Sequence, residues 1–479
     1  MKYIAAIDQS TSGSKAFLVD ENGFVVKRAS LAHQQFYPKP GYAEHDAEEI
    51  YQNVLSLLNT VLEGIPAESV QAIALANQRE TTVFWDKETG EPLCRAIVWQ
   101  DVRGETACRQ LDKYAGYIHE TTGILLSPYY PAGKIRALFA ERPDIRKKAE
   151  EGSVRIGTID NYLVARLTGK SATDTSNASR TQLMNLKTLK WDDKLLEIFG
   201  IPKGCMAEEI LPADADFGTW NGIPVTGVLG DSHATLFGLG CLKSGMAKTS
   251  YGTGSSVMMN VGNAPIISGS GLSASVGFSM AGETMYVLEG NITCSGDTLI
   301  WLCKGLNIFE SPQEIQKLAE SVDGSMGVNL VPAMSGLGAP YFDSDARAIL
   351  CGMSRGTEKA HIAYAALASI AQQITDVLDV MNLESGYSIS ALSADGGGSK
   401  NSLLMQLQAD LAKCSLRCAS ADDITGLGAA YIAGIRTGMY ASFESIPANQ
   451  AESKIYHPKN DRANLRAEWK TAVQRARIK

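Results

Sequence analysis

The sequence lacks any long apolar run. Nowhere do 18 apolar residues follow one another, and the short apolar stretch near Met1 ends at Asp8. A membrane-spanning helix needs about 20 apolar residues and a signal-peptide core about 7–15, so we expect neither here. We therefore expect a soluble cytoplasmic protein that does not associate with a membrane.

Paired cysteines and basic segments are also missing. The nine cysteines include no Cys-x-x-Cys pair, and Cys414 with Cys418, the closest approach to one, lack the second ligand pair of a zinc site. We interpret them as buried thiols in a reducing compartment. The formal net charge is −8 without a long basic run, which makes nucleic acid a poor candidate partner.

Two familiar nucleotide-binding motifs are absent as well. There is no Gly-x-x-x-x-Gly-Lys-Ser/Thr loop, and no Gly-x-Gly-x-x-Gly follows a strand and opens a helix. The glycine-rich stretches are instead Gly252-Thr253-Gly254, Gly336-Leu337-Gly338 and Gly396-Gly397-Gly398. Each alone fits an ordinary turn, but several in one chain indicate places where the backbone approaches something closely.

A strand–turn–strand pattern occurs twice. Residues 3–7 and 16–19 are apolar runs on either side of a Ser/Thr-rich turn, and a helix capped by Asp46 is expected further on. Near the middle, residues 246–251 and 257–259 flank a second turn of small residues. A chance likeness between the two turns is the alternative to a true repeat.

The length of 479 residues argues against one core, because cores stop growing at about 250–300 residues. We predict two halves of related architecture that divide near residues 239–244, with domains 1–240 and 241–479. Alternating strand and helix patterns predict an α/β protein. The chain should close with a helix whose residues Leu465, Trp469 and Val473 share one face.

The first turn is a candidate phosphate site. Ser10-Thr11-Ser12-Gly13-Ser14 offers hydroxyls and closely spaced N–H groups, which bind phosphate, and Lys15 adds a cation directly after. Asp8, at the end of the first strand, is placed to hold hydrated Mg²⁺, which prefers one or two carboxylates. The alternative is a plain hairpin loop capped by an aspartate.

Motifs along nearly the whole chain resemble those of the FGGY carbohydrate kinases, and most closely their glycerol kinase branch. Asp8-Gln9-Ser10-Thr11 is similar to the phosphate loop of the actin, hexokinase and Hsp70 ATPase superfamily. The other segments follow in the family's order: Tyr37-Pro38-Lys39-Pro40-Gly41-Tyr42-Ala43-Glu44-His45-Asp46, Asn77-Gln78-Arg79-Glu80-Thr81-Thr82, Ala96-Ile97-Val98-Trp99-Gln100, Asn177-Ala178-Ser179-Arg180-Thr181, Gly230-Asp231, Gly245-Met246-Ala247-Lys248, Tyr251-Gly252-Thr253-Gly254, Gly336-Leu337-Gly338-Ala339-Pro340-Tyr341 and Asp395-Gly396-Gly397.

The resemblance implies a fold and a set of roles. The fold is the two-domain actin-like ATPase (ribonuclease-H-like) fold with a deep interdomain cleft, and the activity is phosphoryl transfer from ATP with Mg²⁺ to a small polyol or sugar. Asp231 matches the general base and Asp8 the metal ligand. The remaining matches are, for the acceptor, Arg79, Glu80 and Tyr129, and for the nucleotide, Thr11, Ser12, Lys15, Thr253, Gly296, Gly397 and Asn401.

Without the resemblance, the same residues have ordinary interpretations. Arg79-Glu80 would be a surface pair, Tyr129 a core aromatic, and Asp231 a turn residue. His233 beside Asp231 is expected to be a packed or hydrogen-bonded histidine rather than a base.

The pattern departs from that of glycerol kinases where the acceptor is recognised. Ser232-His233 replaces Gln-Gln after the aspartate, and Ser256 replaces an aromatic residue. A less informative difference lies elsewhere, where Ile300 replaces a glutamine near the nucleotide. An open polar pocket at Ser232 and Ser256 favours a four- or five-carbon polyol or ketose. Glycerol itself and a catalytically silent ligand-binding regulator remain the alternatives, and by analogy with the family we expect a homo-dimer or tetramer.

Overall fold

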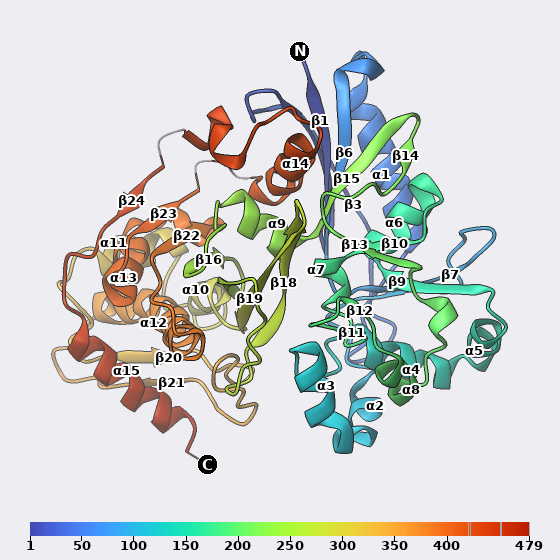
Figure 1. Ribbon diagram of the computed structural model, residues 1–479. Helices are drawn as coiled ribbons and strands as arrows, with labels where there is room; N and C mark the ends of the chain where they lie inside the picture. The colour runs from blue at the N-terminus through green and yellow to red at the C-terminus, as the bar shows by residue number, and fades with distance from the viewer. Residues whose placement is uncertain (420, 422, 451–452, 479) are drawn as a thin grey trace.

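The computed structural model describes residues 1–419, 421, 423–450 and 453–478. It consists of two halves that lie side by side, each built on a mixed sheet with helices packed against it (Figure 1). Among the described residues no helix is both long and apolar enough to cross a membrane. All nine cysteines are free; seven are buried, as predicted, whereas Cys94 and Cys351 are half-buried.

The first half contains a six-stranded sheet in the order β14-β15-β6-β1-β2-β3. β1 and β2 form the predicted hairpin, while β6 and β15 run parallel to β1 on its other side. The strands are β1 (Tyr3–Gln9), β2 (Gly13–Asp20), β3 (Val25–Ala32), β6 (Val70–Asn77), β14 (Thr219–Trp220) and β15 (Ile223–Gly230).

The second half contains a seven-stranded sheet in the order β18-β19-β17-β16-β22-β23-β24. β16 forms a hairpin with β17 and also pairs in parallel with β22, which is followed by parallel β23. The strands are β16 (Met246–Tyr251), β17 (Ser255–Gly262), β18 (Ser273–Met280), β19 (Glu283–Ile292), β22 (Ala391–Asp395), β23 (Leu416–Cys418) and β24 (Ile455–Tyr456). Both halves therefore repeat a hairpin whose first strand is extended by parallel strands, which confirms the predicted repeat.

Helices cover both faces of the first sheet. α1 (Ala47–Leu62) begins at Asp46, whose side chain accepts bonds from the amides of Glu48 and Glu49, as predicted for a cap. α1 and α6 (Ile159–Thr168) bury one face of the sheet. The opposite face lies against α9 (Asp231–Gly238) and α14 (Ile424–Arg436).

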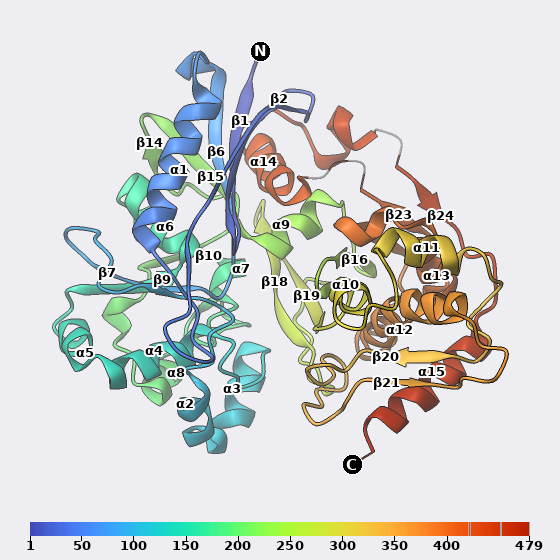
Figure 2. The same ribbon diagram turned by 180° about the vertical axis from the view of Figure 1, so that it is seen from behind.

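α14 comes from the far end of the chain and yet packs on the first sheet (Figure 2). Its Gly428 lies so close to α9 that a Cβ atom there would be 1.9 Å from the carbonyl oxygen of Ala234. Gly426 similarly leaves room for Phe17, because a Cβ would be 2.5 Å from that ring. Residues of the predicted second domain thus pack on the sheet of the first. The domain boundary between residues 240 and 241 stays a prediction.

The second sheet packs against long helices, and the rest of the chain forms smaller layers. α12 (Lys359–Ser385) and α13 (Ser402–Ala412) pack their buried faces into the core of this half. α15 (Ala463–Ala476) closes the chain with Trp469 and Val473 buried, as predicted. The remaining strands are β4 (Gln35–Phe36), β5 (Glu44–His45), β7 (Thr82–Asp86), β8 (Ala96–Ile97), β9 (Val154–Thr158), β10 (Ala172–Asp174), β11 (Met184–Asn185), β12 (Lys190–Trp191), β13 (Glu209–Leu211), β20 (Asn329–Val331) and β21 (Ile349–Cys351). The remaining helices are α2 (Glu105–Gln110), α3 (Ala115–Thr122), α4 (Pro131–Glu141), α5 (Pro143–Glu150), α7 (Thr175–Ala178), α8 (Asp193–Phe199), α10 (Gly296–Lys304) and α11 (Pro312–Ala319).

Candidate active site

The first turn joins β1 to β2 and is held in one shape. The amide and hydroxyl of Ser10 both donate to the carbonyl oxygen of Gly13, at 2.9 and 3.0 Å. A Cβ on Gly13 would lie 2.6 Å from the carbonyl oxygen of Leu31, so this position requires glycine. Thr11 is fixed from outside by two bonds: Gln35 Nε2 donates to its carbonyl oxygen and Trp99 Nε1 to its hydroxyl, both at 2.8 Å.

Lys15 and Ser12 lie at the surface of this turn. Ser12 is exposed, and the Lys15 ammonium is 3.5 Å from the Asp423 carboxylate with 48% of its side chain exposed. Both side chains are therefore accessible to a ligand.

The second turn joins β16 to β17 and packs directly on the start of α10. The amide of Gly296 donates to the carbonyl oxygen of Gly252 at 3.0 Å, and the amide of Ser295 donates to that of Thr253 at 3.1 Å. A Cβ on Gly296 would lie 2.5 Å from the Gly252 oxygen. The structure thus brings Thr253 and Gly296 together, although 43 positions separate them in the sequence.

A third glycine-rich turn adjoins the second one. Gly396, with a φ of +86°, lies against Tyr251, where a Cβ would be 2.5 Å from the carbonyl oxygen. Gly397 has open space around it, and Asn401 caps α13 by accepting a bond from the amide of Leu404 at 2.9 Å. All four residues predicted for the nucleotide in the second half therefore gather at one edge of its sheet.

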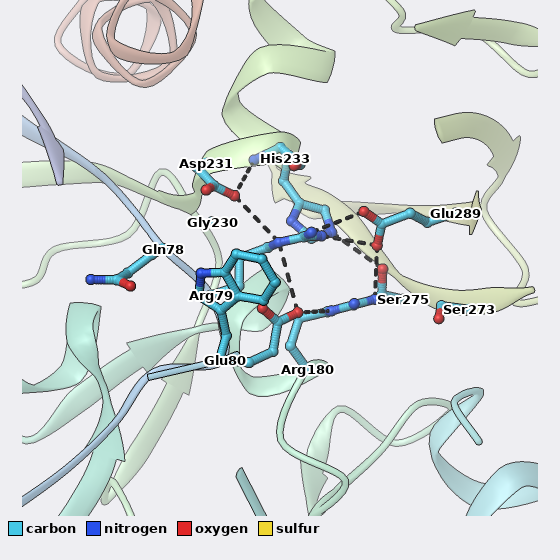
Figure 3. A network of polar contacts seen from close by, with 12 residues as sticks. Gln78, Arg79, Glu80, Arg180, Gly230, Asp231, His233, Ser273, Ser275 and Glu289 are labelled. Atoms are coloured by element: carbon cyan, nitrogen blue, oxygen red, sulfur yellow. Dashed lines mark hydrogen bonds and ion pairs between the residues drawn. The ribbon is translucent and has the colours of Figure 1, made fainter. Parts of the chain in front are cut away.

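Four buried charges lie between the two halves (Figure 3). We call Arg79, Glu80, Arg180 and Glu289 the four-charge cluster. Arg79 binds Glu289 through both terminal nitrogens, at 3.0 and 2.9 Å, and Arg180 Nε donates to Glu80 at 2.7 Å. Arg180 also lies 3.0 Å from Glu289, so that carboxylate holds two guanidinium groups. Arg79 and Glu80 are 6% and 2% exposed, which makes the surface-pair interpretation wrong.

The two arginines of the four-charge cluster keep the Glu289 carboxylate ionised. Burial alone would raise the pKa of Glu289, but Arg79 and Arg180 outweigh it and hold the pKa of that carboxyl far below its ordinary value. The charge balance depends on both halves, since β19 supplies Glu289 and the loop after β6 supplies Arg79.

Asp231 lies at the edge of the cluster, at the first position of α9. Its Oδ1 is 3.3 Å from Arg79 Nε and accepts a bond from the amide of Ser232 at 2.6 Å. Burial raises the pKa of Asp231, although Arg79 opposes the rise. It is the first residue of a helix rather than part of a reverse turn, so the turn-residue interpretation is wrong.

Asp8 faces the same region from β1. Burial, with a further contribution from the charge of Asp231, raises the pKa of Asp8 to about 7. A cation bound at Asp8 would offset this repulsion and the cost of burying the carboxylate. Among the described residues no group of three or more metal-binding side chains occurs, but Mg²⁺ needs only one or two carboxylates besides water and phosphate. The residues present therefore fit a hydrated Mg²⁺.

His233 is packed behind Asp231. Its ring is fully buried, and Nε2 lies 3.2 Å from the hydroxyl of Ser275. Burial, together with the positive field of Arg79, lowers the pKa of His233 well below its ordinary value. This neutral, packed ring agrees with the expectation that His233 is not a base.

Ser256 faces the cluster from β17, and its hydroxyl already has partners. The Ser256 Oγ donates to Glu289 Oε1 at 3.3 Å, and the ammonium of Lys248 donates to Ser256 at 3.4 Å. From the sequence we expected open space with a free hydroxyl at this position. In the structure the hydroxyl belongs to a hydrogen-bond network that runs from Lys248 through Ser256 and Glu289 to Arg79. The wall at this position is therefore polar and organised.

Three residues of this site escaped individual prediction: Arg180, Lys248 and Glu289. Arg180 and Lys248 lie in segments that resemble the family, but they received no role. Glu289 stands in the middle of an apolar strand, and a charge in such a place requires a buried partner. That requirement is the signal that could have identified it.

Comparison with known proteins agrees with this architecture. Family models of the N-terminal and C-terminal domains of the FGGY family of carbohydrate kinases match residues 3–238 and 247–437. Glycerol kinase 1 of Thermotoga maritima is 41% identical over 488 aligned positions, which cover 99% of each chain.

Solved structures extend the likeness to the fold. The crystal structure of Plasmodium falciparum glycerol kinase with ADP has a TM-score of 0.95 at 35% identity, and covers 100% of this chain and 99% of that one. Ligand-bound xylulose kinase from Lactobacillus acidophilus has a TM-score of 0.88 at 23% identity, with 99% and 97% covered, and shows the fold alone. The predicted two-domain, actin-like ATPase fold is confirmed, and the chain belongs to the FGGY family of carbohydrate kinases.

Proposed function

We propose that this protein transfers the γ-phosphoryl group of ATP to a terminal hydroxyl of a small polyol or sugar. The observation that carries the proposal is the position of Asp231 at the start of α9: its carboxylate lies 3.3 Å from Arg79 of the four-charge cluster, and its charge acts on Asp8 beside the first turn. The kinship with a glycerol kinase at 41% identity supports it.

Asp231 is the proposed general base. A primary alcohol is too weakly acidic to attack phosphorus as an alkoxide at neutral pH, so a carboxylate within hydrogen-bond reach accepts its proton as the new O–P bond forms. The bond between the γ-phosphorus and its bridging oxygen breaks, and ADP leaves. A pKa raised toward neutrality makes Asp231 a stronger base than an ordinary aspartate.

The other residues position the two reactants. Arg79, Glu80, Tyr129, Ser232 and Ser256 are the proposed contacts of the acceptor. The proposed nucleotide contacts are Thr11, Ser12, Lys15, Thr253, Gly296, Gly397 and Asn401. Asp8 would hold Mg²⁺, which when bound neutralises phosphate charge.

The acceptor is proposed to be a four- or five-carbon polyol or ketose. The hydroxyl of Ser256, held between Lys248 and Glu289, can bind an additional substrate hydroxyl where an aromatic residue would exclude it. Glycerol is the second candidate, supported by the 41% identity to a glycerol kinase.

The decisive assay measures ADP release with ATP and Mg²⁺ across glycerol, erythritol, ribitol, xylitol, erythrulose, ribulose and xylulose. Turnover that favours a four- or five-carbon compound supports the proposed acceptor. A clear preference for glycerol would retain the mechanism and reject the larger acceptor, and silence with every compound would favour a ligand-binding regulator.

A further inference from the structure

Lys134, on α4, is a buried cation that forms no ion pair with any residue the structure describes. Its side chain is 0% exposed, and no carboxylate among the described residues lies within 4.0 Å of its ammonium. Burial lowers the pKa of Lys134 to about 7, against the attraction of Glu80 and Asp101. Lysine is almost never fully buried without a partner, so its contacts indicate what it does.

The ammonium binds two backbone carbonyl groups. Lys134 Nζ donates to the carbonyl oxygen of Trp99 at 3.1 Å and to that of Tyr129. Both carbonyls belong to segments without helix or strand, which cannot satisfy these groups by regular pairing. One side chain therefore fastens two loops that are 30 positions apart.

The two loops carry aromatic rings beside the four-charge cluster. The rings of Trp99 and Tyr129 lie 5.6 Å apart, inclined by 59°, and Tyr129 also meets Tyr130 edge-on at 5.2 Å. The guanidinium of Arg180 lies over the Tyr130 ring, 5.2 Å from its centre, so this aromatic group adjoins the four-charge cluster.

Trp99 also contacts the first turn, which joins β1 to β2. Its indole nitrogen donates to the Thr11 hydroxyl at 2.8 Å, and its backbone amide donates to the hydroxyl of Thr81, next to Glu80, at 3.3 Å. The Thr11 hydroxyl oxygen accepts the hydrogen bond from the indole, so its own proton can point toward a phosphate oxygen. Trp99 thus connects the acceptor side of the site to the nucleotide side.

We propose that Lys134 is a positioning residue for phosphoryl transfer: its ammonium fixes the backbones of Trp99 and Tyr129, so that their rings form one wall of the acceptor pocket and Trp99 orients Thr11. This inference rests on the proposed function, because it assigns the wall to an alcohol acceptor. Lys134 itself contacts neither reactant.

The first test replaces the ammonium by an apolar group of similar length, Lys134→Met. The acceptor KM, measured with the best compound of the panel, should rise at least tenfold, and the ATP KM should rise by a smaller factor, because Gln35 still holds the backbone of Thr11. A purely structural role would lower the amount of active enzyme, and hence kcat, without moving either KM. Lys170→Met is the matched control, because Lys170 also donates to a backbone carbonyl, that of Asp216 at 2.7 Å, outside this site.

The wild-type enzyme provides a second test that does not depend on the variant folding. The charged or titratable groups facing Lys134 are Glu80, Asp101, Arg103 and Cys108. Burial raises the pKa of the Cys108 thiol to about 11, so this thiol does not titrate between pH 6 and pH 9. The ammonium is present below pH 7 and lost above it. At saturating ATP the acceptor KM should therefore rise at least threefold between pH 6 and pH 9.

The outcomes separate this inference from the proposed function. A folded Lys134→Met with an unchanged acceptor KM would overturn the inference, and so would a flat wild-type KM between pH 6 and pH 9. An inactive wild-type enzyme across the whole panel would instead contradict the proposed function, since both tests are read against wild-type turnover.

Discussion

Replacing Glu289 by glutamine should destabilise the protein strongly. The Glu289 side chain is 0% exposed and lies within 3.0 Å of both Arg79 and Arg180. Glutamine has nearly the same shape but no charge, so two buried guanidinium groups would lose their shared counter-ion. Breaking a buried pair in this way costs about 3–5 kcal/mol. At about 2–4 °C per kcal/mol for a unit of 150–250 residues, Tm should fall by about 6–20 °C.

The assay is thermal unfolding followed by circular dichroism at pH 7. The matched control is Glu105→Gln, which removes an exposed partner of Arg109 one helical turn away. Such exposed pairs contribute about 0.3–0.5 kcal/mol, so its Tm should stay within about 2 °C of the wild type.

The pH dependence gives an independent check. Because the folded protein holds the pKa of Glu289 below its ordinary value of 4.5, this stabilisation is complete above that pH and is lost progressively below it. The difference in Tm between wild type and Glu289→Gln should be constant above about pH 5.5 and narrow at lower pH. A Glu289→Gln protein that melts within 2 °C of the wild type at pH 7 would refute the reasoning.

Three further predictions concern catalysis and the phosphate side of the site. Asp231→Asn should lower kcat by about 10²–10⁴-fold with little change in the ATP KM; turnover at the wild-type rate would reject it as the base. Because the pKa of Asp8 is about 7 when folded and about 3.8 when unfolded, the metal-free protein should lose stability as pH rises from 4 to 7, and Asp8→Asn should remove part of that loss in a melting series. Ser256→Phe should raise the ratio of kcat/KM for glycerol to that for a five-carbon polyol by about tenfold or more; an unchanged ratio would show that this position does not set acceptor size.

Local patterns in the sequence were sufficient for much of the fold. The hairpin of β1 and β2, the cap at Asp46 and the buried face of α15 each depend on neighbours within a few positions, where propensity and periodicity are informative. The repeat was also predictable, because both hairpins carry turns of small residues at the ends of apolar runs.

The site was only partly predictable, because its charges are satisfied from distant parts of the chain. Arg79 was identified from its motif, but its partner Glu289 lies 210 positions away. The role of Ser256 likewise depends on its hydrogen bonds with Lys248 and Glu289, and Glu289 comes from a different strand, 33 positions further along the chain. Lys134 was assigned no role from the sequence, and only the fold shows that its ammonium binds two loop carbonyls.

The packing of α14 on the first sheet has a consequence for dissecting the molecule. Leu427, Ala430 and Tyr431 cover apolar side chains of β1 and β6, although a gene fragment ending at residue 240 would not encode them. Such a fragment would expose that face to water and to other copies of itself, which favours aggregation. The first half therefore depends on α14 to complete its own core. A chimera that joins the first half of this protein to the second half of a relative should fold only if it also keeps α14 of this protein.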